Sequence, residues 1–187
     1  MAITAQINVT PDGFCNHDDV VIDDDFMKFA VDIIEKAELL VLGRKTYELF
    51  KDHWPAAAKN PSLPKWEQNL GKAIDETERI VISSTLSSSD WAGTTFWPTI
   101  DEDPAATLQS GPDALVLGSP SIINQFLHRG ILSTLLLSVH PVMGGSGARL
   151  FDGHPTGRME YLSDYETGRS VRTFEFRNSA HREESSR

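Results

Sequence analysis

Small, hydroxylated and basic residues follow three short apolar segments of the chain, at residues 43–46, 83–85 and 118–121. The first of these turns has the sequence Gly-Arg-Lys-Thr, the second Ser-Ser-Thr and the third Gly-Ser-Pro-Ser. Backbone N–H groups and the positive dipole end at a helix N-terminus bind phosphate well, and arginine and lysine add charge. Each turn alone fits ordinary capping and turn chemistry. The three together favour one shared polyphosphate ligand.

Two familiar nucleotide-binding motifs are missing from the sequence. No Gly-x-Gly-x-x-Gly follows the first apolar segment, so the usual Rossmann fingerprint for a dinucleotide is absent. No Gly-Lys-Ser or Gly-Lys-Thr closes a phosphate loop either, which argues against a P-loop nucleotidase. The adjacent Arg44 and Lys45 are therefore the residues that point most directly to a phosphate monoester or a pyrophosphate.

Composition narrows the class of protein further. The 187 residues contain 27 Asp and Glu against 17 Lys and Arg, which gives a formal net charge of −10. Nucleic acids and anionic membranes need a positive surface, so we expect neither as a partner. The single cysteine, Cys15, excludes an intramolecular disulfide and a cysteine-rich zinc site, and we expect no metal. With no visible signal peptide or membrane span, the protein is expected to be cytoplasmic.

Alternating strands and helices must position these turns. Apolar residues alternate from Ile3 to Val9, which predicts a strand, and those from Phe26 to Ala37 follow the helical spacing i, i+3, i+4, i+7. Three acids precede that helix, where the dipole favours negative charge. Further strands are expected at residues 39–42, 79–83, 91–97, 114–117 and 135–140, and helices from 43, at 65–74, at 104–109 and from 120. Residues 52–64 have loop composition.

The order of these elements predicts an α/β fold with a mostly parallel sheet. Two late runs, at residues 159–165 and 170–177, flank a glycine turn and predict a closing antiparallel hairpin. We expect a single domain over residues 1–178, followed by a polar, disordered tail at 179–187. In such sheets ligands bind outside the carboxyl ends of the strands, where the three turns lie.

Five segments resemble known reductases. Residues 41–48, 80–84 and 115–119 occur in the order found in dihydrofolate reductase, while residues 9–14 and 140–151 resemble two loops of a related branch. Over about residues 3–177 the chain is similar to the stand-alone dihydrofolate-reductase-like family. That family is related to the C-terminal reductase domain of the bifunctional riboflavin-biosynthesis deaminase–reductase.

The resemblance implies a dihydrofolate-reductase-like three-layer fold with about eight strands, and a cleft for NADPH in an extended form, with NADH as the alternative cofactor. It also assigns cofactor-binding roles to residues of this chain. The pyrophosphate and the 2′-phosphate side would be held by Gly43, Arg44, Lys45 and Thr46, and the adenosine end by Ser83, Ser84 and Thr85. The pyrophosphate would also be held by Gly118, Ser119, Pro120, Ser121 and Ile122. The nicotinamide would lie against Ile7 and Asn8.

The substrate side is less defined by the sequence. Asp25 is the nearest counterpart of the carboxylate that contacts the pterin in folate reductases, but with Asp23 and Asp24 it more simply forms the acidic cap of a helix. Asp12 could orient a substrate or close its own turn, and Trp54 could stack on a planar ring or cover the core. The substrate of the riboflavin reductase carries a ribose phosphate, for which only the isolated Lys51 and Arg149 are available.

Two functions from different classes follow. The first is an NADPH-dependent oxidoreductase that reduces a planar N-heterocycle, either a pteridine or a substituted pyrimidine such as that of riboflavin biosynthesis. The alternative is a nucleotide-binding or regulatory module that keeps the NADPH cleft without turnover. The resemblance also implies a homodimer.

Overall fold

A computed structural model describes residues 2–151 and 158–179. The strands are β1 (Ile3–Val9), β2 (Leu39–Gly43), β3 (Glu78–Ile82), β4 (Thr94–Trp97), β5 (Ala114–Leu117), β6 (Thr134–Val139), β7 (Met159–Glu166) and β8 (Arg172–Asn178). The helices are α1 (Asp24–Glu35), α2 (Arg44–Ala57), α3 (Lys65–Glu76), α4 (Glu102–Ser110) and α5 (Pro120–His128), with a short 3₁₀ helix at His17–Asp19. The tail expected to be disordered lies, from residue 180 on, outside the described residues.

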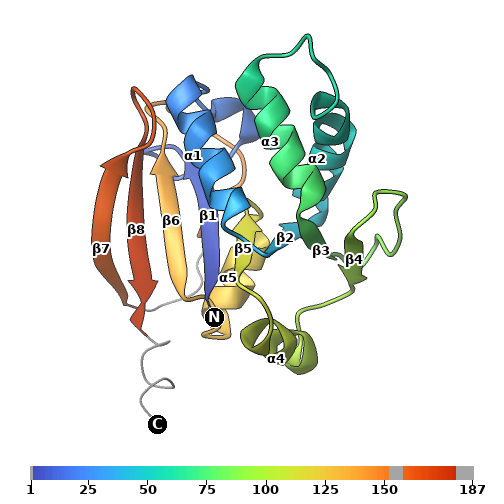
Figure 1. Ribbon diagram of the computed structural model, residues 1–187. Helices are drawn as coiled ribbons and strands as arrows, with labels where there is room; N and C mark the ends of the chain where they lie inside the picture. Colours follow the sequence, from blue (N-terminus) through green and yellow to red (C-terminus); the bar gives the residue numbers. More distant parts are fainter. Residues whose placement is uncertain (1, 152–157, 180–187) are drawn as a thin grey trace.

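One eight-stranded mixed sheet forms the centre of the molecule, with the order β4-β3-β2-β5-β1-β6-β8-β7 (Figure 1). The first six strands of that order are parallel, and β8 runs antiparallel to both β6 and β7. This is the mostly parallel α/β sheet with a C-terminal antiparallel hairpin that the sequence predicts. Among the described residues no helix is long and apolar enough to cross a membrane.

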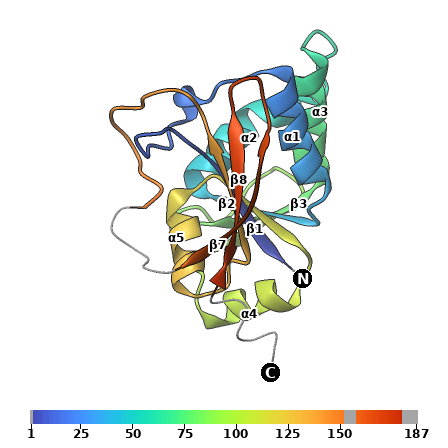
Figure 2. The ribbon, with the colours of Figure 1, turned by 90° about the vertical axis from the view of Figure 1, so that its left-hand side faces the viewer.

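Helices cover both faces of the sheet. Helices α1, α2 and α3 pack together on one face, while α4 and α5 lie on the other, so the molecule has three layers (Figure 2). Strands β2 and β5 are apolar throughout because they are buried on both faces: Leu40 and Leu42 point to the first helix layer and Val41 to the second. The carboxyl ends of the central strands remain uncovered, and this is where the expected site lies.

Helix α2 is longer than the sequence predicts. Residues 52–57 were expected to be part of a surface loop, but they form the last turns of α2, with Pro55 inside the helix. The cause is packing against α3: a Cβ on Gly71 of α3 would come within 2.7 Å of the Ala58 nitrogen and 2.9 Å of the Trp54 carbonyl oxygen. This close approach, which needs a glycine, holds the end of α2 in place in spite of its proline.

Candidate functional site

A cleft opens at the carboxyl ends of the central strands, with a volume of about 1460 Å³. All fourteen residues that the resemblance assigns to the cofactor line it. They are Ile7, Asn8, Gly43, Arg44, Lys45, Thr46, Ser83, Ser84, Thr85, Gly118, Ser119, Pro120, Ser121 and Ile122.

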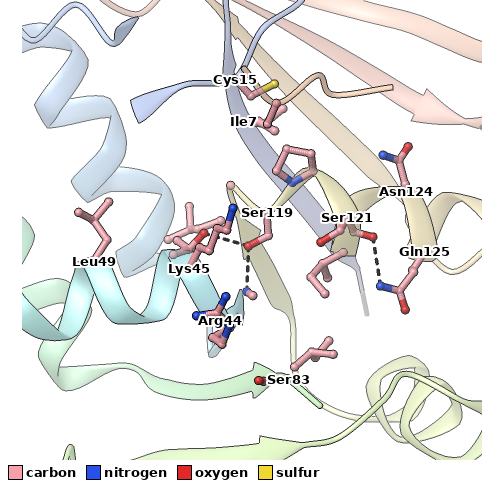
Figure 3. Close-up of a pocket in the computed structure, with 18 of the residues that line it drawn as sticks. Ile7, Cys15, Arg44, Lys45, Leu49, Ser83, Ser119, Ser121, Asn124 and Gln125 are labelled. Carbon is pink, nitrogen blue, oxygen red and sulfur yellow. Dashed lines mark hydrogen bonds between the residues drawn. The ribbon is translucent and has the colours of Figure 1, made fainter. Parts of the chain in front are cut away.

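The strand order arranges these residues in a row. Strands β3, β2, β5 and β1 are consecutive neighbours, so the turn of Ser83, the turn of Gly43, the turn of Gly118 and the end of β1 at Ile7 follow one another along one edge. Three interstrand spacings amount to about 14 Å. Figure 3 shows Ser83 at one end, Ile7 at the other, and Ser119 between them. The row suits an extended ligand with several groups.

The N-termini of α2 and α5 point into this row without a capping side chain. Neither Gly43, which precedes α2, nor Ser119, which precedes α5, makes a side-chain cap, and neither helix has an acid in its first turn. By contrast, Asp23 caps α1, where its carboxylate accepts from the Phe26 N–H at 2.8 Å. Uncapped helix N-termini leave N–H donors and a positive dipole end available to an anionic ligand.

A hydrogen-bonded bridge joins the two helix N-termini. The Gly43 N–H donates to Ser119 Oγ at 2.8 Å, and Thr46 Oγ1 lies 2.9 Å from the same oxygen (Figure 3). Gly118 and Ser119 both have left-handed backbone conformations, with φ of 56° and 58°. A serine rarely adopts this conformation, and such strained residues gather at functional sites. The bridge therefore fixes how the α2 and α5 turns lie relative to each other.

The ionisable side chains that line the cleft are mainly basic. Arg44, Lys45, Arg129 and Arg149 line it, although the whole chain has a formal net charge of −10. Arg44 forms an ion pair with Glu48 at 2.8 Å, one turn along α2. The guanidinium of Arg149 stacks on the Phe14 ring, 4.3 Å from its centroid. This concentration of positive charge favours an anionic ligand.

Three side chains considered for contact with the substrate lie outside the lining of the cleft: Asp12, Asp25 and Trp54. Asp25 is exposed on the first turn of α1, and Trp54 packs within the α2–α3 layer, with its ring 4.7 Å from that of His53. Lys51, one of the two isolated cations, pairs with Asp90 at 2.5 Å and also lies outside the lining, whereas Arg149 is part of it.

Asp12 connects two loops. Its carboxylate accepts from Thr10 Oγ1 at 2.5 Å and from the N–H groups of Gly144 and Gly145 at 3.1 and 2.8 Å. The hydrogen bond from Thr10 is the main reason that the pKa of Asp12 falls to about 2, followed by that from Gly145. Both carboxylate oxygens are thus engaged in holding the loop after β6 against the loop after β1.

A buried polar network, which the sequence analysis does not predict, lies beneath the β1 end of the cleft. Gln6, only 6% exposed, donates from Nε2 to Asn8 Oδ1 at 2.9 Å and to Ser138 Oγ at 3.2 Å. His140 is buried, and its Nε2 lies 3.2 Å from Asn8 Oδ1. The available signal was a glutamine in the middle of a strand whose neighbours are apolar, since buried polar side chains need partners.

The buried His140 makes stability depend on pH. Burial lowers the pKa of His140 to about 4, and the Asp23 carboxylate acts in the opposite direction. Because the folded chain holds the imidazole neutral, its contribution is complete above the unfolded pKa near 6.5 and is lost as the pH falls toward 4. We expect the free energy of unfolding to drop over this interval by on the order of 3 kcal/mol. Urea unfolding at stepped pH measures this, and a His140→Gln variant should flatten the slope; an unchanged slope would refute the assignment.

Comparisons with known proteins agree on the fold. A Shewanella protein whose name assigns it to riboflavin biosynthesis superposes with a TM-score of 0.69 at 17% identity, covering 96% of this chain and 99% of the other. A pyrimidine reductase-like protein of Corynebacterium diphtheriae gives 0.66 at 14% identity, with 95% and 91% covered. The riboflavin biosynthesis reductase of Saccharomyces cerevisiae gives 0.63 at 13% identity, with 95% and 90% covered. The chain thus shares with these proteins a dihydrofolate-reductase-like fold.

The sequence comparison adds one relative. An uncharacterized protein of Bacillus subtilis, YyaP, is 29% identical over 154 residues, which cover 80% of this chain and 79% of that protein. No protein-family model matches the chain. The resemblance seen in the motifs is therefore confirmed at the level of the fold.

Proposed function

We propose that this protein is an NADPH-dependent reductase of a planar N-heterocycle, either a pteridine or a substituted pyrimidine. One observation supports the proposal most: the turns after β3, β2 and β5 and the end of β1, for which we propose adenosine, phosphate and nicotinamide contacts, follow one another along one cleft. The uncapped N-termini of α2 and α5 and the basic lining fit the phosphates of a dinucleotide.

In this proposal the chain binds the cofactor and the substrate and orients them, since the bound cofactor supplies the hydride. The free N–H groups at the start of α2 and at Ser121 would hold the phosphates, and Arg44 with Lys45 would add charge beside the adenosine end. Ile7 and Asn8 would set the position of the reactive ring. Such positioning is the main contribution a protein makes to a hydride transfer.

The size of the cleft supports a second, smaller occupant. Its volume of about 1460 Å³ exceeds the roughly 300–1,000 Å³ of most small-molecule pockets. Two of the proteins with this fold are named for reductases, one pyrimidine reductase-like and one of riboflavin biosynthesis. Of the two isolated cations considered for a phosphorylated substrate, Arg149 lines the cleft, whereas Lys51 is engaged with Asp90.

Turnover is tested by following the absorbance of NADPH with dihydrofolate and with aminopyrimidine substrates. A reductase oxidises NADPH only when an accepted heterocycle is present. If NADPH binds but no pteridine or pyrimidine is reduced, the protein is the nucleotide-binding module without turnover. That second function is favoured by Asp25, the expected acid, which is exposed on α1 and lies outside the lining of the cleft.

Arg44 provides a test of cofactor preference. Replacing Arg44 by alanine removes the cation expected to face the 2′-phosphate, so we expect the Kd for NADPH to rise about tenfold, or about 1.4 kcal/mol, with little effect on NADH. Lys51→Ala is the matched control, because it removes a cation from the same helix but outside the cleft. Isothermal titration would contradict the role of Arg44 if both cofactors weakened equally.

We also propose that the protein is cytoplasmic. We further propose that it forms a homodimer through the outer strands of the sheet. Leu137 on β6, Phe174 and Phe176 on β8 and Tyr161 on β7 share one face, where Tyr161 is 54% exposed and the other three are half-buried. A partly exposed apolar face of this kind suits association. Sedimentation should give twice the chain mass of 20.7 kDa; the mass of one chain would overturn the dimer.

A further inference from the structure

We propose that Asn8 presents its side-chain NH₂ group to the cleft and donates a hydrogen bond to an acceptor on the bound ring, a carbonyl oxygen or a ring nitrogen. This inference deepens the proposed function and rests on it. Asn8 stands at the carboxyl end of β1, lines the cleft and is partly exposed. The chemistry depends on which end of the amide faces the ligand, and three hydrogen bonds determine that.

The first bond fixes the tautomer of His140. The backbone N–H of Val21 donates to His140 Nδ1 at 3.0 Å, and a backbone N–H can only be a donor. Nδ1 must therefore carry a lone pair. Since burial keeps the imidazole neutral near pH 7, its single proton is on Nε2. Edge-to-face packing against Phe26, with ring centroids 4.9 Å apart, holds the imidazole ring in place.

The second and third bonds fix the amide of Asn8. His140 Nε2–H is a donor and lies 3.2 Å from Asn8 Oδ1, so the atom at that position must be the acceptor oxygen. Gln6 Nε2 donates to the same oxygen at 2.9 Å. With Oδ1 held by two donors, Asn8 Nδ2 is directed away from them. Within the described part of the chain, Nδ2 makes no hydrogen bond of its own.

The support behind Asn8 is itself anchored in the sheet. Gln6 Nε2 also donates to Ser138 Oγ at 3.2 Å, and Ser138 Oγ lies 2.8 Å from Thr173 Oγ1 on β8. Thr167 Oγ1 continues the network at 2.9 Å from Thr173. Ser138 and Thr173 are fully buried, so the network has little freedom to rearrange. A donor held this firmly is preorganised and selects ligands that place an acceptor opposite it.

Two bound groups offer the required acceptor. One is the carboxamide oxygen at the nicotinamide end of the dinucleotide, and the other is a carbonyl of the heterocyclic substrate. Asn8→Asp tests the donor directly, because its carboxylate can still accept from His140 and Gln6 while the outward NH₂ becomes an acceptor. Asn8→Ala removes the donor without adding charge, and it carries the test if Asn8→Asp does not fold.

The measurement compares titrations of each variant with NADP⁺ and with adenosine 2′,5′-bisphosphate, which lacks the nicotinamide, and adds KM values for an aminopyrimidine substrate. If Asn8 contacts the dinucleotide, the variants weaken NADP⁺ at least tenfold and leave the bisphosphate unchanged. If it contacts the substrate, both nucleotides bind normally and KM rises at least tenfold.

Three results would overturn the inference. Variants that match the wild type in all three measurements would show that Asn8 donates to neither ligand, while the proposed function would stand. An equal loss for NADP⁺ and the bisphosphate would indicate a general disturbance of the cleft rather than a lost donor. Failure of the wild-type protein to bind either nucleotide would instead remove the proposed function and this inference with it.

Discussion

Replacing Arg79 by methionine is expected to lower the free energy of unfolding by about 3–5 kcal/mol. Arg79 on β3 is only 1% exposed, and its guanidinium donates to four backbone carbonyl oxygens at 2.7–2.9 Å, those of Ile74, Asp75, Thr77 and Ala92. It also stacks on Trp91, 3.9 Å from the ring centroid. Methionine fills similar space but removes all four of these donors, and it leaves the Ile74 carbonyl oxygen buried without one.

Urea unfolding measures this loss, with Arg177→Met as the control. Arg177 on β8 is 41% exposed and its nearest ion-pair partner, Glu160, lies 3.5 Å away, so its replacement should change stability by about 0.5 kcal/mol or less. A loss below about 1 kcal/mol for Arg79→Met would show that the buried guanidinium is not what joins the end of α3 to β3 and β4.

Replacing Gly43 by alanine is expected to weaken dinucleotide binding by about 2 kcal/mol, or roughly thirtyfold. A Cβ on Gly43 would lie 2.6 Å from Ser119 Oγ and 3.1 Å from Ser119 Cβ. Ser119 would have to move, and its hydrogen bonds to the Gly43 N–H and to Thr46 would break. The α2 and α5 turns would then separate, and both are expected to contact the phosphates.

A second substitution distinguishes this steric effect from a general loss of folding. Ser119→Gly removes the side chain that an alanine at position 43 would meet, and its φ of 58° suits glycine. We therefore expect the Gly43→Ala/Ser119→Gly double variant to bind the dinucleotide better than Gly43→Ala alone. Titration of all three variants checks this, and a double variant weaker than the single one would contradict the role of the close approach.

The sequence predicted the strands and the strand-end turns well, because those features are local. Alternation in β1, apolar runs in β2 and β5, and the turns at Gly43 and Gly118 depend on neighbouring residues alone. Helix α2 beyond Asp52 could not be predicted in the same way, because its course past Pro55 depends on contact with Gly71 of α3. Tertiary packing there outweighs local preference.

In the candidate site too, the features that depend on neighbouring residues could be predicted, and those that depend on distant residues could not. The residues expected to bind the cofactor follow strand ends, and a parallel sheet brings strand ends together, so the structure collects them in one cleft. The orientation of the Asn8 side-chain amide could not be predicted from the sequence, because its partner His140 is 132 residues away along the chain. Asp12 and Asp25 illustrate a different limit. An acid near a turn or a helix N-terminus can stabilise that turn or helix, and the sequence alone cannot distinguish this role from a contact with the substrate.

The most direct test of the proposed NADPH cleft is the thermal unfolding of the protein with NADPH. At a hundredfold excess over Kd, binding to the folded state adds about 2.7 kcal/mol, which should raise the Tm of a chain of this size by roughly 5–11 °C. NADH should give a smaller shift if the 2′-phosphate is bound near Arg44. An unchanged Tm with both cofactors at millimolar concentration would contradict a dinucleotide site at the carboxyl ends of β3, β2, β5 and β1.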